Sequence, residues 1–374
     1  MDNRNKFLYL KEEDMIKAGV LDVANCVRVI DETFRLVGEG DYLMGGPREN
    51  EHGMMIWLPD SPRTERMPVT GPDRRFMSLI AYLGGRFHVF GNKWYGSNVE
   101  NRSKNLPRSI HTVTLNDPDT SEPLSIMSGN LISAMRTGAV PGVAAKYLAH
   151  ENSKVVGIIG TGVINRSSLL SICETQKQLE KVKIFDLNMG RAESFKREIS
   201  EQLADMDIEV CSSLEDCIVG SDIINIATSG VVKPEIRTEW LKEGVLLTLT
   251  GAAKLSEDCY INSKIVADNW NMHEAWLQDG KEHPKGVNSV VDWAPTGELL
   301  LLYNEGKIRK ESISNLGDIA LTGNSPRTGD KDKVIFVTGG LAVEDVAWAY
   351  EVYQNALNNE IGQTLSLWDR PHWV

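Results

Sequence analysis

A glycine-rich turn between a predicted strand and a predicted helix is the first segment whose residue types suggest chemistry. The apolar run 155–159 leads directly into Gly160, Thr161 and Gly162, and residues 166–173 have a helical pattern. Glycines permit a tight turn and let backbone amides approach a pyrophosphate at a helix N-terminus, where the helix dipole favours negative charge. The turn therefore predicts a dinucleotide site. Its expected contacts are Gly160, Gly162, Val163 and Ile164.

A carboxylate follows the next predicted strand. Residues 182–185 end at Asp186, where a carboxylate can bond both ribose hydroxyls of NAD and repel the phosphate of NADP. Asn165 replaces the third glycine of the usual fingerprint, and the spacing to Asp186 is slightly longer than usual. Arg191 leaves NADP open as the alternative, because a guanidinium accommodates a 2′-phosphate. The βαβ context predicts NAD. We also count Thr137, Ala227, Thr228 and Gly340 among the expected cofactor contacts.

Alternating strand and helix patterns surround this turn. From Lys154 onward, short β-branched runs alternate with helical stretches, which is typical of βαβ units and a parallel sheet. The runs are residues 155–159, 182–185, 223–227, 246–249, 265–267 and 334–337. We therefore predict an α/β fold with a Rossmann-type doubly wound parallel sheet over residues 136–337. The pattern does not assign helices or strands to the mixed segment 269–323.

The first third of the chain has a different character. Apolar residues recur at helical spacing from Val23 to Val37, whereas residues 45–124 are short apolar pieces broken by glycine and proline, which favours antiparallel strands. A helix over 131–149 contains Pro141, which indicates a kink or the true helix start. A helical tail over 343–357 is expected to return to this region. We predict a second, α+β domain made of residues 1–135 and 338–374.

Composition excludes several classes of protein. The 374 residues carry a formal charge of -12, which disfavours nucleic acid and anionic lipid surfaces as partners. No stretch approaches the roughly 20 apolar residues that span a bilayer, and the charged start lacks the core of a secretory signal, so a cytoplasmic protein is expected. Five cysteines without C-x-x-C spacing predict neither disulfides nor a metal site.

An ordered series of motifs resembles the ornithine cyclodeaminase and mu-crystallin family. The motifs are residues 91–97 (GNKWYGS), 124–127 (LSIM), 132–139 (ISAMRTGA), the turn at Gly160, the pair Pro47-Arg48 and residues 340–345 (GLAVED). The likeness covers residues 7–357. The turn at 162–165 and the Lys93-Trp94 pair look closer to amino-acid dehydrogenases of the diaminopropionate pathway than to cyclodeaminases.

The resemblance implies an enzyme that acts on an amino acid. It implies a homodimer. By the same resemblance, the first third of the chain and the C-terminal tail form the domain that binds substrate and dimerises, and the Rossmann domain is inserted between these two segments. It also implies that Lys93 contacts the reacting amino acid, while Arg48 and Arg136 hold its carboxylate. A desolvated lysine can exchange a proton as catalyst, and arginine can grip a carboxylate bidentately. His111 lies in an alternating strand pattern, which is typical of a structural histidine.

One departure from the family pattern bears on the reaction. Cyclodeaminases carry an aspartate two residues after a glycine that follows the fifth Rossmann strand, whereas this chain has Ala253 there. Alanine transfers no proton, so we expect an NAD(H)-dependent oxidoreductase acting on the C–N bond of a small amino acid or imine. The alternatives are an ornithine cyclodeaminase that recycles its NAD and a non-catalytic mu-crystallin-like binding protein.

Overall fold

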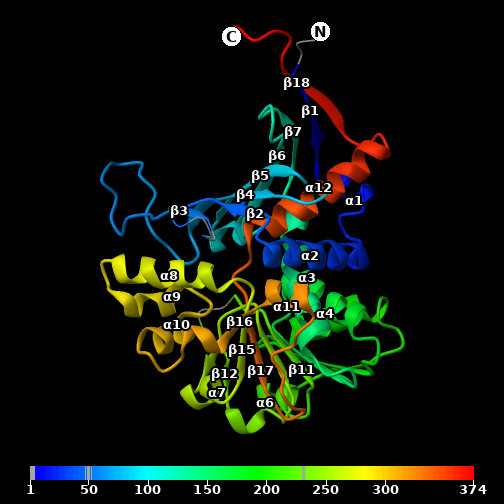
Figure 1. The fold of residues 1–374 in the computed structure, drawn as a ribbon, viewed down its shortest axis with the longest axis vertical. Coiled ribbons are helices and arrows are strands. Elements are labelled where there is room, and N and C mark those ends of the chain that lie inside the picture. The colour runs from blue at the N-terminus through cyan, green and yellow to red at the C-terminus, as the bar shows by residue number, and fades with distance from the viewer. Residues whose placement is uncertain (1–4, 47, 49–50, 52, 230–231) are drawn as a thin grey trace. The chain divides into compact units, whose positions relative to one another are not determined.

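The computed structural model describes residues 5–46, 48, 51, 53–229 and 232–374 (Figure 1). The chain divides into two compact units. Unit one contains the residues up to Asp22, Gly40–Arg136 and Leu341–Val374, and unit two contains Val23–Glu39 and Thr137–Gly340. The domain boundaries expected from the sequence assign one helix to a different unit than the structure does. Helix α2 (Val23–Glu39) belongs to unit two, because its buried face packs against α4 (Val163–Thr175) and α11 (Leu316–Thr322).

Unit one is built on a mostly antiparallel sheet. The strand order is β18-β1-β7-β6-β5-β4-β2, and β3 also pairs with β4. The pairing of β1 with β7 is parallel, whereas the other pairs are antiparallel. The strands are β1 (Asn5–Leu10), β2 (Tyr42–Met44), β3 (Met54–Ile56), β4 (Arg75–Leu83), β5 (Val89–Ser97), β6 (Ser109–Asn116), β7 (Pro123–Ser128) and β18 (Gln363–Trp368). The antiparallel region expected over 45–124 is therefore extended by strands from both ends of the chain.

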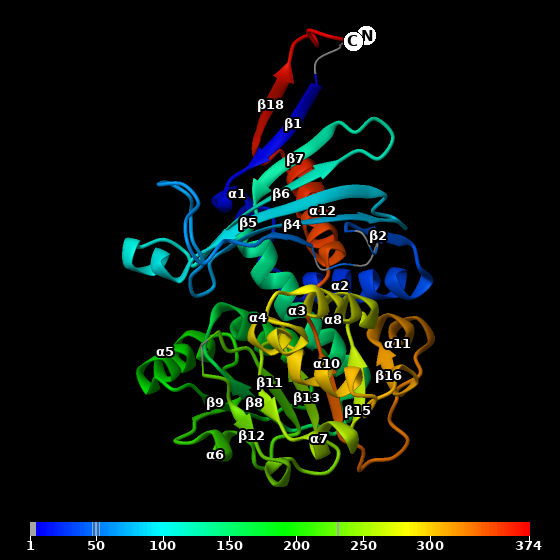
Figure 2. The same ribbon diagram turned by 90° about the vertical axis from the view of Figure 1, so that its left-hand side faces the viewer.

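A helix covers one face of this sheet, and among the described residues several large apolar side chains on the other face are exposed. Helix α12 (Ala342–Asn358) lies across β4, β5 and β6 (Figure 2). Side chains alternate between the faces along a strand, so β5 buries Val89, Lys93 and Tyr95 on the face that α12 covers. The remaining helices of unit one are α1 (Glu12–Lys17), η1 (Val99–Lys104) and the first turns of α3 (Asn130–Leu148). Pro141 lies inside α3 and does not mark its start.

Unit two contains a parallel sheet with the order β10-β9-β8-β11-β13-β17-β15-β16. The chain starts at β8 and winds outward in both directions, which is the doubly wound arrangement of dinucleotide-binding folds. The strands are β8 (Val155–Ile159), β9 (Lys181–Phe185), β10 (Asp207–Val210), β11 (Ile223–Ile226), β13 (Leu246–Leu249), β15 (Lys264–Ala267), β16 (Ile313–Asn315) and β17 (Val334–Val337). A separate pair joins β12 (Glu235–Ile236) to β14 (Lys254–Leu255).

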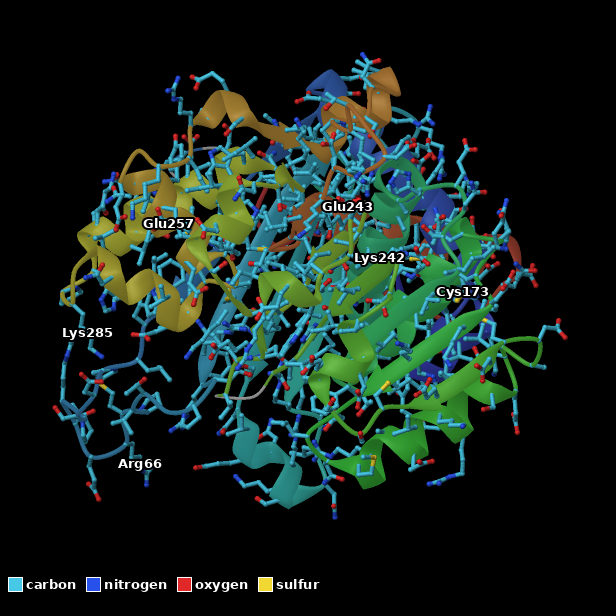
Figure 3. All side chains as sticks on the ribbon, turned by 90° about the horizontal axis from the view of Figure 1, so that it is seen from below. Arg66, Cys173, Lys242, Glu243, Glu257 and Lys285 are labelled. Atoms are coloured by element: carbon cyan, nitrogen blue, oxygen red, sulfur yellow. The ribbon has the colours of Figure 1, made fainter. Side chains whose placement is uncertain are left out.

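Every residue of β11, β13 and β17 is buried, as expected for parallel strands covered on both faces. Charged side chains such as Lys242, Glu243 and Glu257 lie outside this core (Figure 3). The further helices of unit two are α5 (Met189–Ser200), α6 (Leu214–Ile218), α7 (Glu257–Ile261), α8 (Trp270–Glu282), α9 (Val290–Trp293), α10 (Gly297–Asn304), η2 (Thr238–Trp240), η3 (Val287–Ser289) and η4 (Lys310–Ser312). Much of this helical content lies in the segment 269–323 that the sequence pattern did not order.

Candidate active site

The turn after β8 has the backbone that a pyrophosphate site needs. Gly160 has φ +93°, and a Cβ there would lie 2.9 Å from the carbonyl oxygen of Ala227. Only glycine fits that conformation and that approach without strain. Gly162 is the N-cap of α4 and offers no side chain to the first-turn amides, and a Cβ there would meet nothing within 4 Å. The helix N-terminus is thus open toward an anion, so these residues fit a bound dinucleotide.

Asp186 lies beside this turn, directly after β9. Its Oδ2 accepts hydrogen bonds from the Thr161 amide at 3.0 Å and from Thr161 Oγ1 at 2.8 Å. Its Oδ1 accepts from the Asn188 amide at 2.9 Å. Asp186 therefore fixes the turn, and its negative charge faces the place where an adenosine ribose would lie in such a fold. Arg191 is exposed in the first turn of α5.

Asn165 occupies the position of the third glycine of the usual fingerprint, and it connects the same elements through hydrogen bonds. Its buried amide donates to the carbonyl oxygens of Ile159 at 2.7 Å and Gly160 at 2.6 Å. Its Oδ1 accepts from Asn225 Nδ2 at 2.5 Å. Three bonds thus join β8, the turn, α4 and β11. In the usual fingerprint a glycine lets the helix pack closely against the strand. Here the Asn165 side chain joins them instead, and its hydrogen bonds compensate for its burial.

The other expected cofactor contacts have different surroundings. Ala227 and Thr228 follow β11, and both lie against Gly160. Thr137 is half-buried on α3, one residue before Gly138, where a Cβ would lie 2.1 Å from Ser167 Oγ on α4. The Gly340 amide donates to Asp268 Oδ2 at 2.9 Å. The Gly340 amide is thus bonded to a protein carboxylate.

Asp268 organises a buried polar network that the sequence did not reveal. Its Oδ2 accepts from Thr338 Oγ1 and the Gly339 amide, both at 2.8 Å, as well as from Gly340. Its Oδ1 lies 2.8 Å from His273 Nε2. Burial opposes the charge of Asp268, but His273 and the donors at Gly340 and Thr338 lower its pKa overall. The network fixes the last segment of unit two just before the chain enters α12.

A buried charged cluster lies in unit one between β5, α3 and α12. Lys93 Nζ lies 2.7 Å from Asp345 Oδ2, and Arg136 Nε donates to Asp345 Oδ1 at 2.8 Å. Arg136 Nη1 donates to Glu344 Oε2 at 2.6 Å. None of these side chains is more than 5% exposed. The two carboxylates lie in the first turn of α12, where the helix dipole favours negative charge.

The cluster contains two cations and two carboxylates, so its formal charge is balanced. Lys93 Nζ also lies 3.4 Å from Ser133 Oγ, a donor–acceptor contact that ties β5 to α3. A balanced, buried set of charges on the covered face of a sheet is expensive to desolvate, and it is therefore typical of a functional site rather than of a stabilising core.

The sequence and fold of this chain match one known family. The model of the ornithine cyclodeaminase/mu-crystallin family matches residues 20–360. The chain belongs to this family. The expected resemblance is confirmed, and so is the fold class, an α/β protein with a Rossmann-type parallel sheet.

Several relatives of this chain are dehydrogenases and reductases. The chain is 28% identical to N-((2S)-2-amino-2-carboxyethyl)-L-glutamate dehydrogenase of Staphylococcus aureus, over 97% of this chain and 99% of that protein. The structure of Thermococcus litoralis Δ1-pyrroline-2-carboxylate reductase with NADH and L-proline matches with a TM-score of 0.76 and 27% identity, covering 96% of this chain and 99% of the other. An archaeal alanine dehydrogenase dimer with bound NAD gives a TM-score of 0.76 and 25% identity over 97% and 100%.

The protonation states of this family member's cluster follow from its burial. Burial and the nearby Arg136 guanidinium lower the pKa of Lys93 to about 8, against the opposing pull of Asp345. Burial and the charge of Lys93 lower the pKa of His111 to about 3, so this histidine is neutral near pH 7. Burial disfavours the charge of Arg136, but Asp345 and Glu344 raise its pKa overall. Lys93 can thus change its protonation state near neutral pH.

The structure brings Lys93 and Arg136 together, as the resemblance to the family implied. Arg48 is a surface residue whose Nη1 lies 3.0 Å from Glu51 Oε1, and its side chain is 35% exposed. Its expected role as a second carboxylate clamp stays a prediction. Ala253 is buried and lies between β13 and β14 along the chain. That cyclodeaminases of this family carry a carboxylate at this position stays an expectation from the resemblance.

Sequence reasoning missed the acidic half of the cluster. Glu344 and Asp345 belong to a motif that matches the family, and two adjacent acids at the start of an otherwise apolar helix were the available signal. Among the described residues, no group of three or more His, Cys, Asp and Glu side chains is arranged to hold a metal ion. None of the described helices combines the length and apolar character needed to cross a bilayer.

Proposed function

We propose that this chain is an NAD(H)-dependent amino-acid dehydrogenase or imine reductase that acts on the C–N bond of a small amino acid. The observation that carries the proposal is the position of Lys93, which is buried with its Nζ 2.7 Å from Asp345 Oδ2, where burial lowers its pKa to about 8. A general acid or base works best when its pKa lies near the operating pH. The family relatives that act as dehydrogenases and reductases support the same reaction class.

The cofactor is NAD, held by the Gly160–Gly162 turn and the N-terminus of α4. When bound, NAD would supply the hydride acceptor for amine oxidation, and NADH would supply the hydride donor for the reverse reaction. The carboxylate of Asp186 favours a free ribose over a 2′-phosphate, because two negative charges at that point repel each other.

Each residue of the cluster has a role in amine oxidation. The substrate must bind with its amino group neutral, so that the nitrogen lone pair can assist loss of hydride as the C=N bond forms. Neutral Lys93 takes the proton from the substrate ammonium, and its own charge is then stabilised by Asp345 at 2.7 Å. Arg136 uses Nε and Nη1 for the two acids, which leaves Nη2 to face a substrate carboxylate. Arg48 is the second clamp in this proposal.

The uncovered face of the unit-one sheet supports a homodimer. Large apolar side chains stand on this face at 39–44% exposure, and they include Phe76, Ile80, Phe90 and Trp94. The Phe76 and Trp94 rings stack at 6.0 Å, and the register of β4 with β5 places these side chains side by side. A contiguous apolar surface of this kind is typical of an interface between subunits. We propose a cytoplasmic enzyme that dimerises through this face.

The proposal is tested by a screen of amino acids with NAD, and of keto acids plus amines with NADH, followed at the nicotinamide absorbance. We expect net NADH formation from at least one amino acid. Lys93→Ala should lose on the order of 10²-fold or more in turnover, as expected for a general base, with nearly unchanged NAD affinity. Incubation with ornithine and NAD distinguishes a dehydrogenase from a cyclodeaminase. Abundant proline without accumulating NADH would overturn the dehydrogenase in favour of the cyclodeaminase.

A further inference from the structure

Two arginines lie near the Ser97 end of β5, four residues along this strand from Lys93. Arg75 begins β4, and Arg108 immediately precedes β6. Both pair with one carboxylate: Arg75 Nη2 lies 3.3 Å from Asp73 Oδ1, and Arg108 Nη1 lies 2.9 Å from Asp73 Oδ2. Two cations therefore share one anion. The Lys93 cluster is balanced, whereas this arginine pair has an excess positive charge.

The strand register connects the arginine pair to the Lys93 cluster. Arg75 pairs with Ser97 on β5, so Lys93, Tyr95 and Ser97 lead along one face toward Arg75. The Tyr95 ring lies near both sites. Its centroid lies 5.6 Å from Lys93 Nζ and 6.0 Å from Arg75 Cζ, so these cationic groups are at most about 12 Å apart. His111 continues the polar row on β6, with its ring 4.8 Å from that of Tyr95.

Solvent exposure rises along this row. The side chain of Lys93 is 3% exposed, whereas those of Arg75 and Arg108 are 36% and 33% exposed. Arg75 nevertheless has a buried Nε without a hydrogen-bond partner in the part of the chain that the structure describes. A buried donor of this kind needs an explanation, because an unmade bond to a charged group is costly.

A purely structural role accounts for only part of this arrangement. Asp73 has φ 49°, an uncommon conformation for a residue other than glycine, and its carbonyl accepts a hydrogen bond from Ser97 Oγ at 2.5 Å. Both arginines pair with the single Asp73 carboxylate, which leaves one positive charge without a balancing anion in the pair. The neighbouring Arg74 shows the structural alternative, since it simply donates to the Val69 carbonyl at 3.2 Å and braces the preceding loop. That loop also carries Arg66 (Figure 3).

We propose that Arg75 and Arg108 form a second anion subsite that binds the distal carboxylate of the substrate. This inference rests on the proposed function, because it takes Lys93 and Arg136 as the site of the reacting amino acid. Hydrogen bonds of about 3 Å at each end leave up to roughly 6 Å for the substrate atoms between the two cationic groups. An amino acid or imino acid of about the size of glutamate spans that distance. The substrate class is therefore an amino acid with a carboxylate in its side chain, and alanine-like amino acids are poor substrates.

The binding test uses glutarate and butyrate, which differ by one carboxylate. We measure both affinities by calorimetric titration for the wild type, Arg75→Gln, Arg108→Gln and the control Arg74→Gln. The wild type should bind glutarate more tightly than butyrate. Loss of a charge-assisted hydrogen bond should weaken glutarate binding about tenfold or more in Arg75→Gln, and the control should stay within about twofold of the wild type. Arg75→Lys should restore part of the affinity, because lysine keeps the charge without the fork.

The kinetic test compares L-glutamate with L-norvaline, which has the same chain length and lacks the second carboxylate. With NAD, Arg75→Gln should raise the KM for L-glutamate about tenfold relative to that for L-norvaline. Wild-type preference for norvaline, or equal effects of Arg75→Gln and Arg74→Gln, would overturn the subsite and leave the dehydrogenase intact. Absence of turnover with every amino acid would overturn the proposed function, and the glutarate titration would then decide the subsite alone. Melting curves of each variant establish that it is folded.

Discussion

Replacing Asp345 with asparagine should move the pH dependence of the reaction in a direction that the cluster fixes. Asp345 is the nearest anion to Lys93, at 2.7 Å, and it holds the lysine pKa at about 8 against burial and Arg136. Removing an opposite charge at this distance changes a pKa by about one to three units. In Asp345→Asn, the pKa of Lys93 should therefore fall to between about 5 and 7.

The sign of the effect on rate follows from the role of Lys93 as a base. Amine oxidation needs neutral Lys93, so kcat/KM in the wild type should rise with pH and level off above the lysine pKa of about 8. At pH 6, only about 1% of Lys93 is then neutral. In Asp345→Asn, the rise of kcat/KM with pH, the rising limb of the profile, should occur one to three pH units lower than in the wild type, even if the maximal kcat/KM is reduced.

The assay is a pH profile of kcat/KM at saturating NAD, together with NMR titration of the Lys93 ammonium in the free enzyme. Glu344→Gln is the matched control. Glu344 contacts Arg136 rather than Lys93, so its loss should shift the limb in the same direction by a smaller amount. Breaking a buried pair costs about 3–5 kcal/mol, so the melting temperature of each variant is measured first. A limb that stays near pH 8 or moves upward in Asp345→Asn would refute this account of Lys93.

Three further predictions concern the cofactor turn and the uncovered sheet face. Gly162→Leu should abolish NAD binding in a fluorescence titration while leaving the melting temperature nearly unchanged. Gly160→Ala should lower the melting temperature, because Gly160, unlike Gly162, has a positive φ and would place a Cβ 2.9 Å from a carbonyl oxygen. Asp186→Ser should narrow the preference for NAD over NADP by about tenfold or more, measured as the ratio of the two dissociation constants; an unchanged ratio would point to Arg191 instead. Trp94→Glu should convert the dimer to a monomer in light scattering, and a wild type that is monomeric at micromolar concentration would contradict the dimer proposal.

Much of the nucleotide-binding unit was predictable because its signals are local. Strand β8, the glycine turn and α4 are contiguous, and the repeated β-branched runs mark six of the strands in the parallel sheet. The segment 269–323 was not predictable, because apart from α8 its helices are too short to show a clear helical period and depend on packing for their stability. Asp268 shows the same limit, since its partners at Thr338 and Gly340 lie about 70 residues away.

The first unit was predictable only in part. The short strands between 45 and 124 were recognisable as a class, but β1 and β18 were missed. Strand β18 is an edge strand with every residue exposed, so it has no buried face to impose a pattern. The helix α2 was recognised, but its allocation to unit two depends on packing against α11. Lys93 and Arg136 came from family resemblance. Their pairing with Asp345 was not predictable, because ion pairs between distant residues leave no periodic trace in the sequence.

The long sequence separation inside the charged cluster determines when the site can form during synthesis. Arg136 and its acidic partners are 208 and 209 positions apart, and all residues of unit two lie before Glu344 in the chain. A ribosome adding about 5–20 residues per second therefore completes the nucleotide-binding unit first. Until the start of α12 emerges, Lys93 and Arg136 have no carboxylates from that helix and no cover over their face of the sheet. A chain that stops before Glu344 retains a complete dinucleotide fold but leaves these two cations without their partners.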